Sequence, residues 1–175
     1  MSKKKLNSPP RNRVVFLDID GVLVTDRAHY TINNSVRNEP MMVFDPIGIK
    51  LLNNLCLKYY LSVVFCSTWR HKYDLKTILR THGFTGNFHE DINTPLGGKF
   101  SATDTQNRGF QIEDWLEEHQ EVSVYIIFDD LPLNGYVGHH ICTDYNDGIL
   151  SSHYLEAISL LESQIKNLDN PSESE

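Results

Sequence analysis

The sequence predicts an α/β fold, a doubly wound, Rossmann-like and mostly parallel sheet with helices on both faces. From residue 14 onward, short apolar runs alternate with segments of helical periodicity, and strands separated by helices imply parallel crossovers. Polar residues follow three of the apolar runs, at the edge where such sheets bind ligands. With 175 residues, 40% hydrophobic and 22% charged, the composition is typical of one soluble domain, which we expect over residues 13–168.

The first half of the chain predicts two strands, a helix and a flap. Residues 13–19 form a short run rich in β-branched side chains, which is typical of a strand buried on both faces. Residues 25–42 are polar and predict a long loop or small flap, at about residues 25–43. Asp45 and Pro46 then offer a helix start, and apolar side chains follow at helical spacing. Residues 61–66 predict the second strand.

The second half repeats this alternation. The expected helices cover residues 71–82, 109–119 and 149–166, and Gly83 ends the first of them. The expected strands cover residues 122–128 and, more weakly, 139–142. Residues 84–107 are weakly patterned and rich in glycine, with one short strand expected near Asn87 and Phe88.

Charge is unevenly distributed along the chain. The net charge is −7, but five basic and no acidic residues fall within positions 1–13, so the remainder has 11 basic and 23 acidic residues, or −12. The net negative charge of the rest of the chain argues against broad, sequence-independent binding to nucleic acid. We expect residues 1–12 to be a disordered basic leader, either simply solubilising, which we favour, or touching an anionic partner. Residues 169–175 are expected to be an acidic tail.

Cysteine, histidine and hydropathy patterns exclude several classes of protein. The three cysteines are widely spaced in apolar contexts, which fits neither a disulfide framework nor a zinc ribbon. The eight histidines show no metal-ligand spacing, so we expect structural or surface roles for them. No apolar stretch reaches the roughly 20 residues of a membrane span, and no signal-peptide core is evident. We therefore expect a cytoplasmic protein without a membrane partner.

Acidic and hydroxyl side chains follow the three strongest strands. The first strand leads to Asp18 and Asp20, which share one face of an extended chain, and the next two lead to Ser67–Thr68 and Asp129–Asp130. Parallel strands bring these residues to one edge of the sheet. Because converging carboxylates repel, a divalent cation is the simplest compensation, and hard oxygen ligands favour Mg²⁺. A metal-bound phosphate beside a carboxylate nucleophile is typical of aspartyl-phosphate chemistry.

These residues resemble a known superfamily. Asp18-Ile19-Asp20-Gly21-Val22-Leu23 is similar to the first motif of the haloacid dehalogenase-like (HAD) phosphatases. Val63-Val64-Phe65-Cys66-Ser67 resembles their second motif and Phe128-Asp129-Asp130 their fourth, so the resemblance covers residues 14–150. A narrower HAD group, associated with nucleic-acid (RNA) repair proteins, is similar in three strings: Ser67-Thr68-Trp69-Arg70, Thr94-Pro95 and Arg108-Gly109-Phe110-Gln111-Ile112.

The resemblance implies a role for each matched residue. Asp18 would attack phosphorus and also bind Mg²⁺, while Asp20 would act as general acid and then general base. Gly21 would permit the sharp departure of the backbone that lets both carboxyl groups face the substrate. The Ser67 hydroxyl and the Thr68 N–H would hold phosphoryl oxygens. The implied metal ligands are Asp18, Asp20 through its carbonyl, Asp129 and Asp130.

The third motif of the superfamily, usually a lysine, has two candidates. Arg108 lies at the start of a predicted helix, 129 − 108 = 21 positions before Asp129, and also matches the narrower group. Lys99 lies further away, beside Gly97 and Gly98. We favour Arg108, whose guanidinium can contact phosphate through two N–H groups.

Two residues at the rim of the predicted site have alternative roles. Trp69 can stack on a base or pack beneath the next helix, and we favour packing. Arg70 can bind a second phosphate or pair with an acid. For Arg70 we weigh the two roles equally.

The function that these residues favour is a Mg²⁺-dependent phosphomonoesterase that works through an aspartyl-phosphate. A flap alone leaves the site open, which suits a nucleotide or the terminal phosphate of a nucleic acid. The alternatives are a phosphatase of a small phosphorylated metabolite or a phosphoprotein, transfer of phosphate to a second alcohol, and a non-catalytic phosphate-binding module. A receiver domain is disfavoured, because such domains place the acceptor aspartate on a middle strand of the chain. The oligomeric state stays open.

Overall fold

The computed structural model describes residues 12–32, 43–96 and 108–170. Its centre is a five-stranded sheet in the order β3-β2-β1-β4-β5, and every neighbouring pair is parallel. The strands are β1 (Arg13–Leu17), β2 (Ser62–Phe65), β3 (Asn87–Asn93), β4 (Val124–Asp129) and β5 (His140–Cys142). The predicted doubly wound parallel sheet is therefore confirmed.

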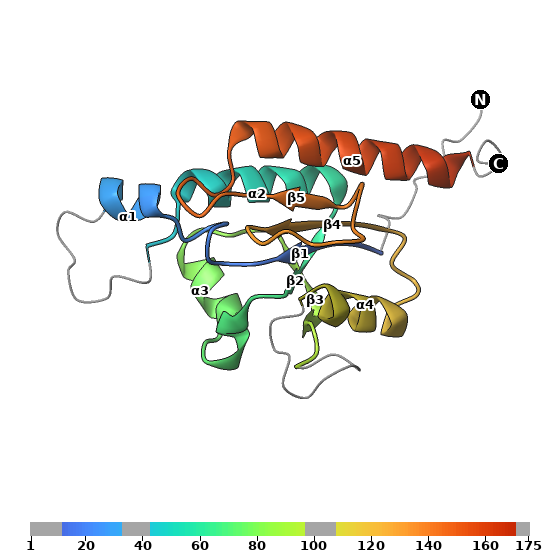
Figure 1. Ribbon diagram of the computed structural model, residues 1–175, viewed down its shortest axis with the longest axis horizontal. Coiled ribbons are helices and arrows are strands. Elements are labelled where there is room, and N and C mark those ends of the chain that lie inside the picture. Colours follow the sequence, from blue (N-terminus) through green and yellow to red (C-terminus); the bar gives the residue numbers. More distant parts are fainter. Residues whose placement is uncertain (1–11, 33–42, 97–107, 171–175) are drawn as a thin grey trace, which may run out of the picture.

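Helices connect and cover these strands. The helices are α1 (Asp26–Ile32), α2 (Pro46–Tyr59), the 3₁₀ helix η1 (Thr68–His71), α3 (Leu75–Thr81), α4 (Arg108–Glu118) and α5 (Ser151–Asp169). In Figure 1, α2 and α5 lie side by side over one face of the sheet, and α4 lies on the opposite side. None of these helices combines the length and apolar character that crossing a membrane requires.

The central strand β1 is apolar on both faces because both faces are covered. Val15 and Leu17 point into a large core that α2, α3 and α5 close. Val14 and Phe16 point into a smaller core, to which α4 contributes Ile112 and Trp115. Among the described residues, α4 is thus the helix that covers this second face.

One helix occurs where the sequence predicted only a loop or flap. The Oγ1 atom of Thr25 accepts a hydrogen bond of 3.1 Å from the Ala28 N–H, and this bond begins α1. Ala28 is the buried residue of the helix, so α1 lacks the apolar periodicity that identifies a helix in sequence. An antiparallel bridge between Val24 and Phe44 joins the two ends of the flap, whose residues 33–42 lie outside the described part.

Other element boundaries also differ from the sequence prediction, most of all those of α3 and β3. The predicted helix over residues 71–82 is shorter, because the Asp74 carboxylate accepts from the Thr77 N–H and starts α3 at Leu75. The short strand expected near Asn87 is the longer β3, an edge strand whose polar residues hide it in the sequence. Residues 1–11 of the predicted leader and residues 171–175 of the predicted tail lie outside the described residues.

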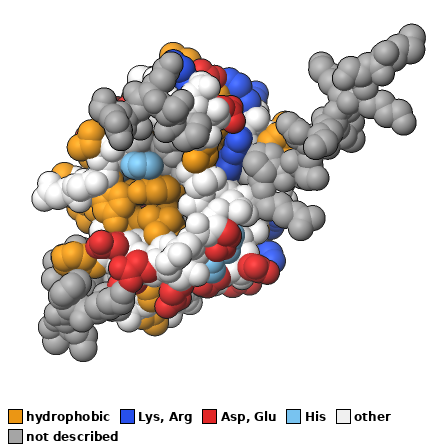
Figure 2. All heavy atoms as spheres, turned by 90° about the vertical axis from the view of Figure 1, so that its right-hand side faces the viewer, with side chains coloured by type: hydrophobic (Ala, Val, Ile, Leu, Met, Phe, Trp, Pro, Cys, Tyr) orange, Lys and Arg blue, Asp and Glu red, His pale blue; other side chains and the backbone are white. Residues whose placement is uncertain are grey.

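The described surface carries charge in separate areas. On the face in Figure 2, hydrophobic side chains form a central patch, acidic side chains lie along its lower side, and basic side chains lie above and to the right. No continuous basic surface covers the described part of this face. This distribution agrees with the net negative charge of residues 14–175.

Candidate active site

The carboxyl ends of β1 and β4 lie at the topological switch point of the sheet, where the strand order reverses. β1 leads to β2 and β3 on one side, and the chain then returns to add β4 and β5 on the other. Asp18 directly follows β1, Asp129 ends β4, and the Asp18 N–H donates to the Phe128 carbonyl over 3.0 Å. Open α/β sheets bind ligands at such a switch point, because the connections diverge there and leave a crevice.

A single cation joins the two buried carboxylates at this point. Nη1 of Arg108 lies 2.5 Å from Oδ2 of Asp18 and 2.6 Å from Oδ2 of Asp129. Asp18, Asp129 and Arg108 are 3%, 0% and 9% exposed, so solvent screens these pairs little. Because Arg108 is the first residue of α4, its helix positions it across the site, and Lys99 lies outside the described residues.

Asp18, Asp129, Asp130 and Arg108 form an acidic cluster whose charges are only partly balanced. Burial, and then the Asp18 charge, raise the pKa of Asp129 to about 6 even though Arg108 opposes the shift. Burial and the Asp18 charge likewise raise the pKa of Asp130. Burial alone would lower the pKa of Arg108, but the nearby acids, Asp18 foremost, outweigh it and raise that pKa. Negative charge therefore exceeds positive charge here, which favours binding of a further cation.

The residues present fit a divalent metal ion with oxygen ligands. Asp18, Asp129 and Asp130 each offer a carboxylate oxygen, and the three oxygens lie within 4.8 Å of one another. Gly21 has φ +67°, and a Cβ there would lie 2.6 Å from the Asp130 carboxylate, so glycine makes room for that ligand. An all-carboxylate donor set suits a hard cation such as Mg²⁺.

Asp20 is held by a partner that sequence reasoning missed. The Trp69 Nε1–H donates to Oδ2 of Asp20 over 2.7 Å. Burial raises the pKa of Asp20, the Trp69 hydrogen bond opposes this shift, and the Asp18 charge adds to it. Trp69 is buried against Phe44 and Tyr73, so it packs as favoured from the sequence, and no pattern along the chain indicated its contact with Asp20.

Ser67 and Thr68 follow β2 at the same edge of the sheet. Ser67 is fully buried, and its Oγ accepts from the Trp69 N–H over 3.3 Å, which caps η1. Since this bond uses an acceptor site, the hydroxyl proton is left to donate. Thr68 is exposed at the start of η1. This turn can therefore offer hydrogen-bond donors to an anion.

The guanidinium of Arg70 forms hydrogen bonds within the protein. Its Nη1 donates to the carbonyls of Cys66 (2.7 Å) and Ser67 (2.6 Å), and its Nε donates to Thr94 (3.2 Å). Its Nη2 donates to the Pro95 carbonyl and to Oε1 of Gln111. These five bonds occupy the five N–H donors of a guanidinium. The arrangement disagrees with the predictions that Arg70 binds phosphate or pairs with an acid, because its donors tie together the ends of β2, β3 and the side of α4.

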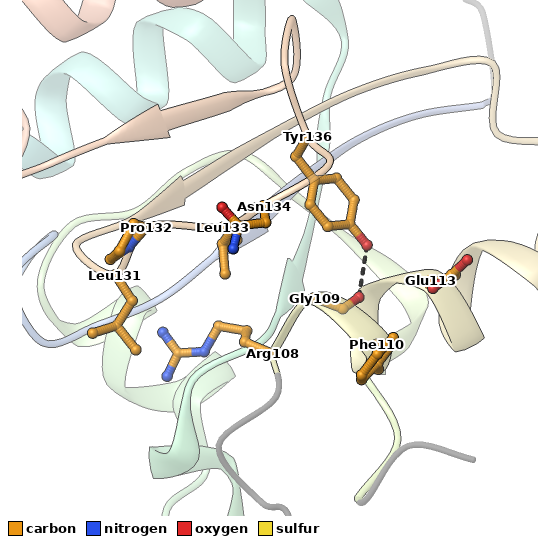
Figure 3. Close-up of a pocket in the computed structure, with 9 residues that line it drawn as sticks. All are labelled: Arg108, Gly109, Phe110, Glu113, Leu131, Pro132, Leu133, Asn134 and Tyr136. Atoms are coloured by element: carbon orange, nitrogen blue, oxygen red, sulfur yellow. Dashed lines mark hydrogen bonds between the residues drawn. The ribbon is translucent and has the colours of Figure 1, made fainter. Parts of the chain in front are cut away.

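Two cavities open next to the cluster. The first, of about 350 Å³, lies beside Arg108 between the start of α4 and the segment after β4 (Figure 3). Its wall includes Phe110, Leu131 and Tyr136, whose hydroxyl donates to the Gly109 carbonyl over 2.6 Å. The second, of about 250 Å³, is lined by Asp20 and by residues of α1 and of the loop after β5, Tyr145 among them.

The comparisons with known proteins agree with this geometry. Residues 14–154 match the family described as the HAD domain in Swiss Army Knife RNA repair proteins. The match spans the strands that supply Asp18, Ser67 and Asp129 and the helix that supplies Arg108. Searches of curated proteins and of solved structures gave no match. The chain therefore belongs to the HAD domain family of Swiss Army Knife RNA repair proteins.

Proposed function

We propose that the protein is a cytoplasmic, Mg²⁺-dependent phosphomonoesterase that works through an aspartyl-phosphate on Asp18. The observation that carries the proposal is the bridge from Arg108 to Asp18 and Asp129. It fixes a buried carboxylate at the switch point, beside a group of oxygen ligands. Family membership supports phosphatase activity in general, and the chemistry follows from the side chains.

In the first step, a carboxylate oxygen of Asp18 attacks phosphorus as the bond from phosphorus to the leaving oxygen breaks. Asp20 donates its proton to that leaving oxygen, for which its raised pKa is suited. In the second step, Asp20 takes a proton from water, whose oxygen attacks phosphorus and frees Asp18 and inorganic phosphate.

Other groups hold the phosphoryl oxygens and balance charge. Ser67 and the backbone of η1 donate hydrogen bonds to phosphoryl oxygens, and Arg108 offsets the charge of Asp18. The carboxylates of Asp18, Asp129 and Asp130 would hold Mg²⁺, and the resemblance to the HAD phosphatases implies the Asp20 carbonyl as a further ligand. When bound, the ion supplies positive charge that draws phosphate to Asp18 and stabilises the transition state.

We propose a nucleotide or a nucleic-acid terminal phosphate as substrate. Asp20 lines the cavity of about 250 Å³, so a leaving group protonated by Asp20 would occupy it. Tyr30 and Tyr145 line this cavity and are 75% and 51% exposed, which makes them available to stack on a base. The family's description as RNA repair proteins supports the same substrate class.

A panel assay with and without Mg²⁺ tests this function. The panel contains nucleotides, 5′- and 3′-phosphorylated oligonucleotides, sugar phosphates and a phosphopeptide. We expect Mg²⁺-dependent release of phosphate, highest for nucleotides or oligonucleotides, and loss of turnover in Asp18→Asn. Asp169→Asn, an exposed isosteric change at the end of α5, is the matched control and should keep full activity.

Four results would contradict parts of the proposal. Activity without metal, or full turnover by Asp18→Asn, would exclude the mechanism. Preference for sugar phosphates or the phosphopeptide would replace the substrate class but keep the mechanism. Phosphate binding without turnover on any substrate would identify a non-catalytic binding module.

A further inference from the structure

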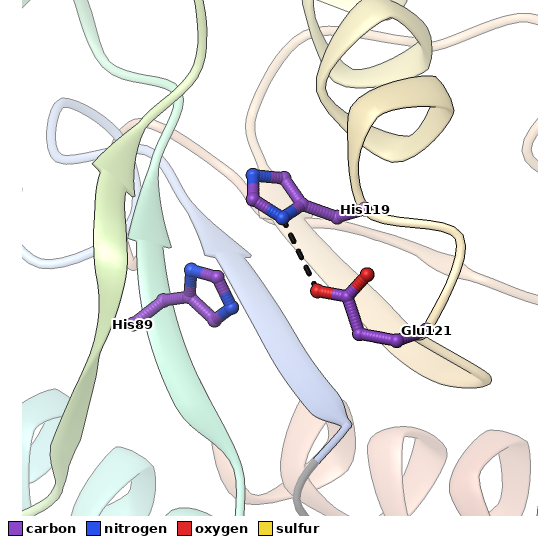
Figure 4. A group of neighbouring side chains, drawn as sticks. All are labelled: His89, His119 and Glu121. Atoms are coloured by element: carbon purple, nitrogen blue, oxygen red, sulfur yellow. Dashed lines mark hydrogen bonds and ion pairs between the residues drawn. The ribbon is translucent and has the colours of Figure 1, made fainter.

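A second group of metal-ligating side chains lies away from the acidic cluster. His89 of β3, His119 just after α4 and Glu121 in the following turn face one another (Figure 4). Each offers one ligand atom, and these atoms lie within 4.8 Å of one another. The sequence predicted structural or surface roles for the histidines because 30 positions separate His89 from His119, and only the fold brings them together.

Hydrogen bonds already orient both imidazole rings. Nε2 of His119 lies 3.1 Å from the Asp91 carboxylate, and its Nδ1 lies 3.2 Å from Oε1 of Glu121. With the Nε2–H donated to Asp91, Nδ1 and the Glu121 oxygen are two acceptors that face each other, so a proton or a metal ion must lie between them. Nδ1 of His89 lies 3.1 Å from both the carbonyl oxygen and the backbone N–H of Asp91. In the tautomer that donates from Nδ1 to the carbonyl, Nε2 carries no proton and is left as a ligand.

We propose that His89, His119 and Glu121 form a binding site for a divalent transition metal, with zinc as the metal that fits best. Imidazole nitrogens favour zinc over Mg²⁺, and two histidines with one carboxylate leave a fourth position for water. Two ligands of a tetrahedral zinc ion, at about 2.1 Å each, lie roughly 3.4 Å apart. The separation of 3.2 Å between His119 and Glu121 is close to this value. The ligand nitrogen of His89 lies within 4.8 Å of the other two ligand atoms, so its ring would move closer to them when the metal binds.

The metal would fasten α4 to the edge of the sheet. α4 covers its face of the sheet through a small core, with Ile112 and Trp115 as its fully buried side chains. Trp115 packs against both rings, at centroid distances of 4.8 Å to His89 and 3.9 Å to His119. A bond from metal to β3 on one side and to the end of α4 on the other would hold this core closed.

The site is separate from the phosphate chemistry. Arg108 begins α4 and His119 follows its last residue, so the two lie about 16 Å apart along the helix axis. The proposal therefore does not depend on the phosphatase function, and its failure would leave that function unaffected.

The test is zinc binding by the full chain, measured by isothermal titration calorimetry and by thermal melting after removal of metal with a chelator. We expect one zinc ion per chain in Asp18→Asn as in the wild type, and a higher melting temperature with zinc. His89→Gln and Glu121→Gln should each weaken zinc binding by more than about 10-fold and abolish the zinc-dependent rise in melting temperature. Glu118→Gln, an exposed change at the end of α4, is the matched control and should keep both the zinc affinity and the rise in melting temperature.

Other outcomes would overturn the assignment. Circular dichroism of the metal-free variants shows whether they are folded, so that a loss of binding is not a loss of structure. If folded His89→Gln and Glu121→Gln bind zinc like the wild type, or if only Asp18→Asn loses binding, the metal lies elsewhere. If the folded wild-type chain binds no zinc, a proton occupies the space between His119 and Glu121.

Discussion

The indole N–H of Trp69 donates a hydrogen bond of 2.7 Å to the carboxylate of Asp20. This bond stabilises the charged form of Asp20, whereas burial and Asp18 stabilise the neutral form. Trp69 therefore tunes the acidity of the residue that must carry a proton in both proposed steps.

Trp69→Phe should move the alkaline limb of the kcat profile to higher pH. Asp20 donates its proton only when neutral, and losing the hydrogen bond raises its pKa further, so the neutral form persists to higher pH. A profile of kcat against pH checks this. Tyr73→Phe keeps the ring that packs on Trp69 and should leave the profile unchanged. A profile in Trp69→Phe that stays in place or moves to lower pH would contradict this role.

Arg108→Ala should lower kcat by about 100- to 1,000-fold and stability by about 3–5 kcal/mol, because two buried carboxylates lose their counter-ion. Arg108→Lys keeps the charge and should recover part of both losses. Steady-state kinetics and urea unfolding measure the two effects. If Lys99→Ala loses turnover and Arg108→Ala does not, the active-site cation is misassigned.

Gly21→Ala should weaken activation by Mg²⁺ by about 10- to 100-fold, since the new Cβ would displace the Asp130 carboxylate. A Mg²⁺ titration of kcat measures this effect. Gly135→Ala separates the clash from backbone strain, because Gly135 also has a positive φ, of +89°, and open space around it. The Mg²⁺ dependence of Gly135→Ala should match the wild type, and an equal loss in both variants would count against the role of Asp130.

Arg70→Ala should destabilise the protein by roughly 3 kcal/mol, because several carbonyls and Gln111 lose a charged donor. Competition by inorganic phosphate should change little in the folded variant. Arg80→Ala is a comparison, since within the described part of the chain the Arg80 side chain donates a single hydrogen bond, to the Phe84 carbonyl. A large loss of phosphate affinity without a loss of stability would instead support phosphate binding by Arg70.

Tyr30→Ala and Tyr145→Ala should raise KM for nucleotides by about 5- to 150-fold, the equivalent of roughly 1–3 kcal/mol of stacking. The same variants should keep the wild-type KM for a sugar phosphate, which has no base. An unchanged KM for nucleotides would place the leaving group outside the cavity that Asp20 lines, and an equal rise for both substrates would exclude base stacking as the cause.

The order of apolar runs along the chain predicts the parallel sheet and the position of the site, because the carboxyl ends of parallel strands lie at a common edge. Asp18, Ser67 and Asp129 follow three apolar runs, so a parallel sheet brings them to one edge without any knowledge of side-chain contacts. The helix α1 and the length of β3 could not be predicted, because their residues are mostly polar. Both elements depend on contacts with other segments more than on their own periodicity.

Contacts between distant side chains are the part of the site that sequence patterns do not reveal. The partners of Arg70 and Trp69 come from several strands and loops, and no periodicity encodes them. The arginine, tryptophan and histidines concerned are also residues with several common roles. Their roles follow only once the fold fixes their neighbours.

The uneven covering of the sheet has a consequence for the order in which the molecule comes apart. β1 is hydrogen-bonded to strands on both sides and buried on both faces, so its amides should exchange with solvent only on global unfolding. α4 depends on a smaller core and should detach earlier, taking Arg108 with it. Mild denaturation should then yield a form that keeps Asp18 and Asp129 assembled but lacks their cation, so that inactivation precedes loss of the sheet.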